Sequence, residues 1–558
     1  MDNAAIADNF SLLAKLMDIH GENSFKTKTY AIAAFNIEKL PLALHETPRE
    51  KLFGIKGIGD SVGRKVIEML DTGQLEILTQ YIENTPKGII ELLNIKGIGP
   101  KKIHTIWKEM SIESPGELLY ACNENRLTLY KGFGEKTQQN VREAIEFYLQ
   151  NQGSFLFAQL SELFPQIDGY LKKLFSPGKV RVTGAYRRQV PTIDELEFVI
   201  LENNETIKPK FQTAQPPELL EETANSILYK LKNGLRLRLY TGNKNRAQQL
   251  FETTGSVVFV EEFKRRYPAL VYNGDETEED EIIFQKAGIQ YVPPCLRENS
   301  VILEKAKNKH LPVLIQPGDI KAIIHSHSKW SDGANTIEEM ANECIKRGLE
   351  YLVLSDHSKA AFYANGLSEE RIREQHRHID ELNAKLKPFK IFKSIECDIL
   401  NDGSMDYTDD ILATFDLVIA SIHTNLKMPE DKAMQRLLKA ISNPYVTILG
   451  HMTGRLLLSR NGYPLDHKKI IDACIENNVV IELNAHPRRL DIDWRYIDYV
   501  LEKGGLLSID PDAHALEGYD DIKYGVLAAQ KGGLTKEKNL SSFTLSQFEK
   551  FLKKNERI

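Results

Sequence analysis

The stretch IIHSHS (residues 323–328) places two histidines immediately after a short apolar run. The arrangement returns in YLVLSDH (351–357), LVIASIH (417–423) and VTILGH (446–451), where each apolar run leads to a histidine. Such runs predict strands that are buried on both faces, as in a parallel sheet. An α/β barrel builds its active site from side chains at the carboxyl ends of successive strands. The pattern therefore predicts a barrel over residues 320–558, with a site at one end.

Nine His, Asp and Glu side chains of this region are candidate metal ligands. They are His325, His327, Asp332, His357, Glu396, His423, His451, Asp512 and His514. One ion cannot use nine ligands, so the set predicts a polynuclear, hydrolytic centre. Histidine and carboxylate ligands suit Mn²⁺, Zn²⁺ or Fe²⁺ better than Mg²⁺. We expect two or three divalent ions, Mn²⁺ or Zn²⁺ in the first place and Fe²⁺ as an alternative.

Four residues are candidates for a direct part in catalysis. Glu396 is a good candidate for a bridging carboxylate, and Asp512 repeats with His514 the i, i+2 spacing of the first two histidines. Arg455 (HMTGRLL) and Arg489 (HPRRLD) follow predicted strands and would neutralise charge that develops on a phosphodiester. Each arginine fits a structural ion pair equally well.

Composition indicates a globular protein of several domains. The 558 residues are 42% hydrophobic and 27% charged, which is ordinary for a globular protein. Because the net charge is −6, any contact with nucleic acid must rest on local geometry and not on an overall positive charge. No apolar run approaches the ~18–20 residues of a membrane span, and the N-terminus lacks a signal-peptide pattern. The five cysteines are isolated, which indicates free thiols in a reducing compartment. We expect a cytoplasmic monomer.

A repeat occupies the N-terminal region. LFGIKGIGDSVGRKV (52–66) is echoed by LLNIKGIGPKKIHTI (92–106) and more weakly by LYKGFGEKTQQNV (129–141). Glycine pairs between helices let backbone N–H groups converge on a phosphate oxygen. The near-copies predict sequence-independent binding of the DNA backbone, with Lys56 and Lys96 adding charge. The candidate contact residues are Gly57, Gly59, Lys65, Gly97, Gly99, Lys101 and Lys102.

These copies resemble helix-hairpin-helix motifs, and the first 150 residues resemble the lyase-type and fingers domains of family X DNA polymerases. The resemblance implies a domain that grips the 5′-phosphate of a DNA gap. Lys65 stands where some members form a Schiff base with an abasic sugar. A phosphate contact or an ordinary surface lysine is the alternative for this residue.

VTGAYRRQVPTIDELEFVI (182–200) resembles the palm motif of that family, Gly-Ser-x-Arg-Arg followed by Asp-x-Asp. The corresponding positions hold Gly184, Ala185, Arg187, Arg188, Glu195 and Glu197, and the later third carboxylate falls at Arg236 (LRLRLY). Two-metal nucleotidyl transfer needs short carboxylates around Mg²⁺, and a misplacement of about 1 Å costs on the order of a hundredfold in rate. We therefore expect a palm that is present and catalytically silent.

The C-terminal order H-x-H, S-D-G, D-H, I-E, I-H, G-H, D-A-H resembles the PHP (polymerase and histidinol phosphatase) domain. The whole chain thus resembles bacterial family X polymerases with a C-terminal PHP exonuclease. One departure is Ile323, where the family often has an acid that supports the first histidine. His486 lies outside the ligand pattern and is a candidate outer-shell group.

The expected fold is multidomain, with helical N-terminal domains, an α+β palm and thumb, and a distorted α/β barrel. The thumb region is expected to be a small α/β segment that contains VVFVEEF (257–263). The expected domains are lyase-type (1–80), fingers-type (81–150), palm-like (151–242), thumb-like with a linker (243–315) and PHP (320–558).

The expected function is DNA repair by metal-dependent 3′–5′ exonucleolytic hydrolysis of gapped, nicked or 3′-ended DNA. Three alternatives stay open: a working gap-filling polymerase with a proofreading barrel, a histidinol-phosphatase-like enzyme, and a non-catalytic DNA-binding scaffold. The second leaves the repeated glycine loops unexplained.

Overall fold

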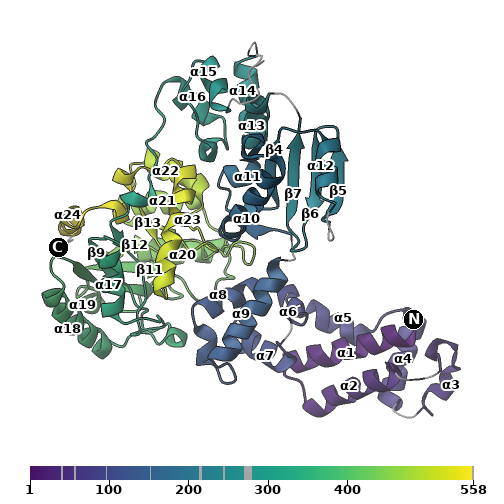
Figure 1. Cartoon of the computed structure of the whole chain (residues 1–558). Coiled ribbons are helices and arrows are strands. Elements are labelled where there is room, and N and C mark those ends of the chain that lie inside the picture. Colours follow the sequence, from purple (N-terminus) through teal and green to yellow (C-terminus); the bar gives the residue numbers. More distant parts are fainter. Residues whose placement is uncertain are drawn as a thin grey trace. The chain divides into compact units, whose positions relative to one another are not determined.

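In the computed structural model the chain forms two compact units. One contains residues 1–123 and 127–149, and the other contains 124–126 and 150–558 (Figure 1). The structure describes all residues except 39, 41, 56–57, 96, 151–152, 213–215, 243–244, 269, 271–278 and 556–558, and leaves out the side chains of 147, 150, 554 and 555. Among the helices so described, none has the length and apolar character needed to cross a membrane.

The first unit is helical. Its α-helices are α1 (Asn3–His20), α2 (Ser24–Glu38), α3 (Arg49–Leu52), α4 (Asp60–Thr72), α5 (Glu76–Glu83), α6 (Lys87–Leu92), α7 (Pro100–His104), α8 (Pro115–Asn123) and α9 (Glu135–Gln150). One apolar core joins them, from Phe10 of α1 to Ile145 of α9. Each strong repeat forms a pair of short helices with a glycine turn between them, α3 with α4 and α6 with α7. This is the predicted helical N-terminal architecture.

A five-stranded sheet occupies the middle of the chain, in the order β2-β4-β7-β6-β5. Its strands are β2 (Val180–Thr183), β4 (Glu195–Ile200), β5 (Glu218–Thr223), β6 (Ser226–Lys230) and β7 (Arg236–Thr241). β4 and β7 are parallel and the other pairs are antiparallel. α10 (Phe157–Phe175) shares the core of the sheet, where Phe164 stacks with Phe198 of β4. The α+β prediction is confirmed for this region.

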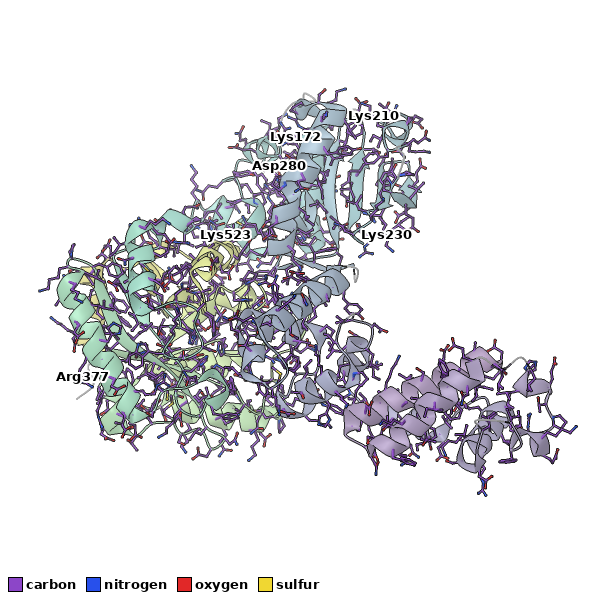
Figure 2. All side chains as sticks on the ribbon, turned by 60° about the horizontal axis from the view of Figure 1, so that its bottom comes forward. Lys172, Lys210, Lys230, Asp280, Arg377 and Lys523 are labelled. Carbon is purple, nitrogen blue, oxygen red and sulfur yellow. The ribbon has the colours of Figure 1, made fainter. Side chains whose placement is uncertain are left out.

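The region after the sheet is helical in the residues described, where an α/β segment was expected. Its helices are α13 (Arg246–Thr254), α14 (Val257–Arg266), α15 (Glu281–Lys286) and α16 (Val301–Lys307). VVFVEEF begins α14 because the Ser256 hydroxyl caps it by accepting from Phe259 N at 3.1 Å. Phe259 and Phe263, four residues apart, then share one buried face. Asp280, labelled in Figure 2, is buried between the guanidinium groups of Arg187 (2.8 Å) and Arg297.

The C-terminal region is a seven-stranded sheet in the order β14-β13-β12-β11-β10-β9-β8, and all neighbouring pairs are parallel. The strands are β8 (Ala322–Ile323), β9 (Tyr351–Leu354), β10 (Lys390–Asp398), β11 (Leu417–Ser421), β12 (Val446–Leu449), β13 (Val480–Asn484) and β14 (Leu507–Asp510). The α-helices between and after them are α17 (Ile337–Lys346), α18 (Glu369–Lys385), α19 (Asp409–Leu412), α20 (Glu430–Ile441), α21 (His467–Glu476), α22 (Ile497–Glu502), α23 (Ile522–Lys531) and α24 (Leu545–Asn555). The segments that follow the first and last strands meet through a parallel bridge between Ser326 and Ala513, so the sheet is a nearly closed barrel.

Successive side chains along a strand point to opposite faces of the barrel sheet, and both faces are packed with apolar side chains. Tyr351 and Val353 of β9 belong to one core, whereas Leu352 and Leu354 belong to the core shared with the surrounding helices. Phe548 of α24 joins the first core and stacks on Tyr351 at 4.6 Å. The apolar runs are thus buried on both faces, and the predicted α/β barrel is confirmed.

Candidate metal centre

The nine predicted ligands come from the ends of successive barrel strands and the loops that follow. Glu396 lies on β10, and His423 and His451 each follow a strand by two residues. His325 and Asp512 sit in turns after the first and last strands, with φ of 60° and 51°. Because parallel strands end at the same edge, residues far apart in sequence converge there.

Three groups of these side chains have ligand atoms within 4.8 Å of one another. They are His327–Asp332–His357–His514, His325–His327–Glu396–Asp512 and His357–Glu396–His423. His451 joins them, since its Nε2 lies 3.0 Å from Oε1 of Glu396. The nine residues therefore form one continuous cluster.

Glu396 is the centre of this cluster. Its Oε1 lies 3.3 Å from His325 Nε2 and 3.1 Å from His423 Nε2, and its Oε2 lies 3.0 Å from His357 Nδ1. A carboxylate that faces histidines from several strands with both oxygens is placed to bridge two ions. Asp332 has the corresponding position in the neighbouring group, 3.5 Å from both His357 and His514.

The donor atoms fit divalent metal ions. Buried polar atoms are normally hydrogen-bonded, yet among the described residues many of those left without a bond belong to this cluster. They are His325 Nε2, His327 Nδ1, Asp332 Oδ2, His357 Nδ1, Glu396 Oε2, His451 Nδ1 and His514 Nε2. Imidazole nitrogens and carboxylate oxygens aimed at one another in this way are suited to a transition-metal site.

Electrostatics keep the central carboxylate ionised. Burial alone would raise the pKa of Glu396, but His423, His325 and His357 together bring it well below its usual value. For His327, burial lowers the pKa to about 3, and repulsion by His514 and His357 acts in the same direction. For His325, His357 and His423, burial lowers the pKa, but the carboxylates beside them raise it above its usual value overall, so a metal ion that binds there would displace protons from these rings.

Supporting acids that the sequence reasoning missed orient two of the histidines. Glu482 on β13 lies 2.5 Å from His325 Nδ1, and Asp398 on β10 lies 3.2 Å from His423 Nδ1. Each contact turns the opposite ring nitrogen toward Glu396. Glu482 thereby supplies the support that Ile323 cannot give. The available signal was an acid within an otherwise apolar strand, as in VVIELN.

Asp356 is a further buried acid that the sequence reasoning did not select. It accepts hydrogen bonds from Ser328 N (2.8 Å) and from Gln375 Nε2 (2.7 Å), and Ser331 Oγ contacts it as well. These bonds tie the loop that carries His327 and Asp332 to the end of β9. Asp356 is thus placed to fix the ligand loop.

The two candidate arginines have different surroundings. Arg455 pairs with Asp493, and its Nε donates to the carbonyl of Arg489 at 2.9 Å. Of its two suggested roles, the structural ion pair is the one that this geometry favours. Arg489 Nε lies 3.7 Å from Asp512, so this arginine is beside the cluster. His486 belongs to none of the metal-binding groups found among the described residues.

Glu197 of the palm motif is hydrogen-bonded to neighbouring groups of the palm itself. Glu197 Oε2 accepts from Ala185 N at 2.9 Å, and Glu197 Oε1 accepts from the Tyr240 hydroxyl at 3.0 Å. A Cβ at Gly184 would lie 1.6 Å from Glu197 Oε2, so the carboxylate fills the space beside the turn. Burial raises the pKa of Glu197.

Two arginines of β7, Arg236 and Arg238, lie opposite the palm acids of β4. Arg238 Nε lies 2.6 Å from Glu195 Oε2, whereas Arg236 Nε donates to the backbone carbonyl of Asp194 at 3.2 Å. In the parallel pairing of β4 and β7, Arg238 lies opposite Glu197, and side chains two residues apart share a face. Arg236 lies opposite Glu195 in the same pairing, so both cations are on the face of the palm acids, and the third carboxylate position stays assigned to Arg236 as a prediction.

The hairpin turns present open backbone. Gly59 and Gly99 directly precede α4 and α7, and Gly97 has a φ of +93°. Apart from each glycine's own chain neighbours, no atom of the described residues lies within 4 Å of a Cβ built at any of these three glycines. Lys101 and Lys102 begin α7, and Lys65 lies in α4 with Nζ 5.7 Å from the centre of the Tyr30 ring. Gly57, Lys56 and Lys96 lie outside the described residues.

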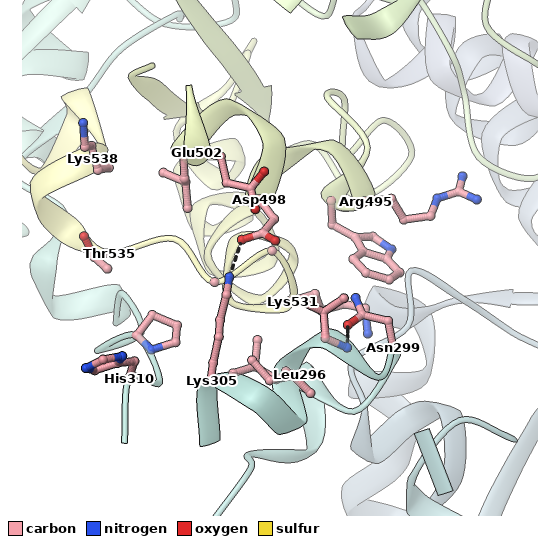
Figure 3. A pocket seen from close by; sticks show the side chains of 17 residues that line it. Leu296, Asn299, Lys305, His310, Arg495, Asp498, Glu502, Lys531, Thr535 and Lys538 are labelled. Atoms are coloured by element: carbon pink, nitrogen blue, oxygen red, sulfur yellow. Dashed lines mark hydrogen bonds and ion pairs between the residues drawn. The ribbon is translucent and has the colours of Figure 1, made fainter. Parts of the chain in front are cut away.

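A separate cavity of about 370 Å³ lies between the α16 region and the barrel (Figure 3). Leu296 and Trp494 contribute to its wall, and Lys305 pairs across it with Asp498 at 2.8 Å. None of the nine metal-cluster residues lines it. The cavity is thus distinct from the metal centre.

Comparison with known families matches three parts of the chain. Residues 1–75 match a helix-hairpin-helix domain, residues 89–146 match a SAM-like helix-hairpin-helix tandem, and residues 324–486 match the PHP domain. Helix-hairpin-helix repeats in one chain with a PHP barrel define an enzyme that acts on nucleic acid. The repeats indicate DNA binding, and the clustered ligands of the barrel indicate divalent metal binding.

Full-length similarity gives the particular family. The chain is 32% identical to the DNA polymerase/3′-5′ exonuclease PolX of Bacillus subtilis, over 98% of both chains. It belongs to the bacterial PolX family. The barrel region is also similar to a probable phosphatase of Thermoanaerobacter sp., with 26% identity over 42% of this chain and 94% of the relative. A probable phosphatase of Yersinia enterocolitica is 28% identical over 34% of this chain and 77% of that relative. These relatives support phosphoesterase activity in the barrel.

Proposed function

We propose that this protein is a DNA-processing enzyme whose main activity is metal-dependent 3′–5′ exonucleolytic hydrolysis in the barrel. The observation that carries the proposal is the contrast between the two centres. The barrel gathers Glu396 and eight further candidate ligands into one cluster, whereas the palm acids are engaged by Arg238, Tyr240 and the Ala185 backbone. Mn²⁺ or Zn²⁺ suits the barrel donor set best, with Fe²⁺ as the alternative.

The residues of the barrel have separable roles in this proposal. Bound divalent ions would polarise the phosphodiester and lower the pKa of an attacking water. Glu396 and Asp512 would hold the ions in place, and Glu482 and Asp398 orient the histidines that contact Glu396. Arg489, beside Asp512, is placed to neutralise charge on the phosphate oxygens as the bond breaks.

In this proposal the helix-hairpin-helix turns bind the DNA that the barrel cuts. Their open glycine backbones and the lysines at 65, 101 and 102 would contact phosphates without reading sequence. A histidinol-phosphatase-like activity is the second candidate, because phosphatases resemble the barrel. It gives the DNA-binding repeats no role.

A labelled DNA digestion tests the proposal. The proteins compared are wild type, His325→Ala, the palm variant Glu195→Ala/Glu197→Ala, and His310→Ala, which removes an exposed histidine outside the metal cluster. With Mn²⁺ present, we expect His325→Ala to lose at least a hundredfold in cleavage rate, and the other two variants to keep wild-type rates. Loss of a residue that only supports a metal ligand typically costs 10- to 100-fold, so loss of a ligand itself should cost about a hundredfold or more.

Two results would refute the assignment. Cleavage that survives in His325→Ala would remove the barrel from the mechanism, and cleavage that is lost in the palm variant would move the active site to the palm. Faster hydrolysis of histidinol phosphate than of DNA would favour the phosphatase alternative.

A further inference from the structure

Phe362 lies in the loop after β9, five residues beyond the metal-cluster histidine His357. Its side chain is 81% exposed, although phenylalanine is usually buried. The loop spans residues 358–367 and includes the short 3₁₀ helix Phe362–Ala364. An aromatic ring kept in water beside a candidate active site calls for a physical explanation.

The loop has a fixed shape. At its end, Leu367 N donates to the carbonyl of His357 at 2.9 Å, and Ser358 and Leu367 form a bridge. Gly366 packs so closely on Ser358 that an added Cβ would lie 1.9 Å from the Ser358 carbonyl oxygen. Asn365 Nδ2 donates to the carbonyl of Trp330 at 3.3 Å. Both ends of the loop are therefore tied to ligand-bearing segments.

Tyr363 is the aromatic neighbour of Phe362 in this loop. The two rings meet edge to face, with centroids 5.7 Å apart. The Tyr363 ring also contacts Arg126, whose Cζ lies 4.4 Å from the ring centroid. The Phe362 ring thus stands on a loop at the carboxyl-terminal rim of the barrel, and hydrogen bonds tie this loop to the segments that carry His357 and Asp332.

We propose that Phe362 stacks on the base next to the phosphodiester that is cut, and so positions the end of the DNA strand. Every nucleobase has a π face, so such a contact tolerates any sequence, as expected for an exonuclease. A ring held rigidly in water loses little entropy when a base covers it. This role rests on the proposed function, because it assigns a nucleic-acid end to the barrel.

The test compares Phe362→Ala and Phe362→Trp with wild type and with Leu438→Ala. Leu438 is an exposed apolar residue on helix α20 of the same barrel, 39% exposed. The first readout needs no catalysis: a single-stranded oligonucleotide with 2-aminopurine as its 3′-terminal base is titrated with protein in EDTA. Stacking quenches the fluorescence of this base. We expect quenching with wild type, Phe362→Trp and Leu438→Ala, and its loss with Phe362→Ala.

The second readout is kinetic. Stacking is worth about 1–3 kcal/mol per base, so KM for the oligonucleotide should rise roughly 5- to 150-fold in Phe362→Ala and recover in Phe362→Trp. Hydrolysis of bis(4-nitrophenyl) phosphate, which has no base, should keep its wild-type rate in both variants.

The outcomes separate this role from others. Unchanged KM and unchanged quenching in Phe362→Ala would overturn the proposal, as expected if an apolar protein partner covers the ring. An equal loss of activity on both substrates would also overturn it, because it indicates a structural role for the ring. If wild type fails to cut DNA, the proposed function fails, whereas loss of quenching in Phe362→Ala still supports stacking.

Discussion

The imidazole Nδ1 of His325 lies 2.5 Å from a carboxylate oxygen of Glu482, although the two residues are 157 positions apart in the sequence. His325 follows the first strand of the barrel, and Glu482 lies on the sixth. The histidine is fully buried, so its orientation depends on this partner. The usual support two residues before His325 is absent because that residue is Ile323.

We expect Glu482→Gln to weaken metal binding by roughly 10- to 100-fold, since loss of an outer-shell acid typically has this effect. Competitive titration of the purified protein with Mn²⁺ and a chelating dye measures the affinity directly. The matched control is Glu476→Gln, which makes the same change at an exposed position at the end of α21. Equal affinity in the two variants would mean that His325 does not depend on Glu482.

The sequence predicted the barrel because strand burial and ligand position repeat together. In YLVLSDH, one short stretch gives both the buried strand and its terminal histidine. Glu482 and Asp398 were not predicted because they lie inside strands. The histidine that each acid contacts is distant in sequence and becomes its neighbour only in the folded barrel. VVFVEEF was misread because β-branched residues favour strands locally, while the Ser256 cap and the packing of Phe259 and Phe263 favour a helix.

We expect no templated primer extension by wild type with Mn²⁺ and dNTPs, and none by Glu195→Asp/Glu197→Asp. Shortening the two acids restores the carboxylate type but leaves the cationic Arg238 on the same face, opposite residue 197. Gel analysis of a labelled primer–template measures extension, and a commercial polymerase is the positive control. Extension by wild type would contradict a silent palm and revive the gap-filling alternative.

Replacing Lys101 and Lys102 by alanine should weaken DNA binding and lower its dependence on salt. Each phosphate contact contributes roughly 0.9 to the slope of log K against log salt for duplex DNA, so two lost contacts reduce the slope by about 1.8. Fluorescence anisotropy with a gapped duplex between 50 and 200 mM salt, the range over which such contacts are resolved, measures this slope. Lys346→Ala, an exposed lysine on α17, serves as the control. An unchanged slope would show that these lysines do not touch phosphates.

The stability of the barrel should depend on Asp521, which precedes α23 beside Lys523 (labelled in Figure 2). Burial raises the pKa of Asp521 to about 7; Lys523 opposes the shift and Asp520 adds to it. The folded state therefore holds a proton that the unfolded state releases near pH 4. Between pH 4 and 7 the folded state binds more protons, so stability falls as pH rises through this range and levels off above pH 7.

The Asp521→Asn variant has no carboxyl group at this position, so it does not lose stability in this way as the pH rises. We expect its melting temperature to exceed that of wild type by several degrees at pH 8, at about 2–4 °C per kcal/mol, and the gap to narrow toward pH 5. Differential scanning calorimetry at several pH values measures the gap, with the exposed Glu517→Gln as the control. A gap that does not change with pH would mean that Asp521 titrates alike in the folded and unfolded chains.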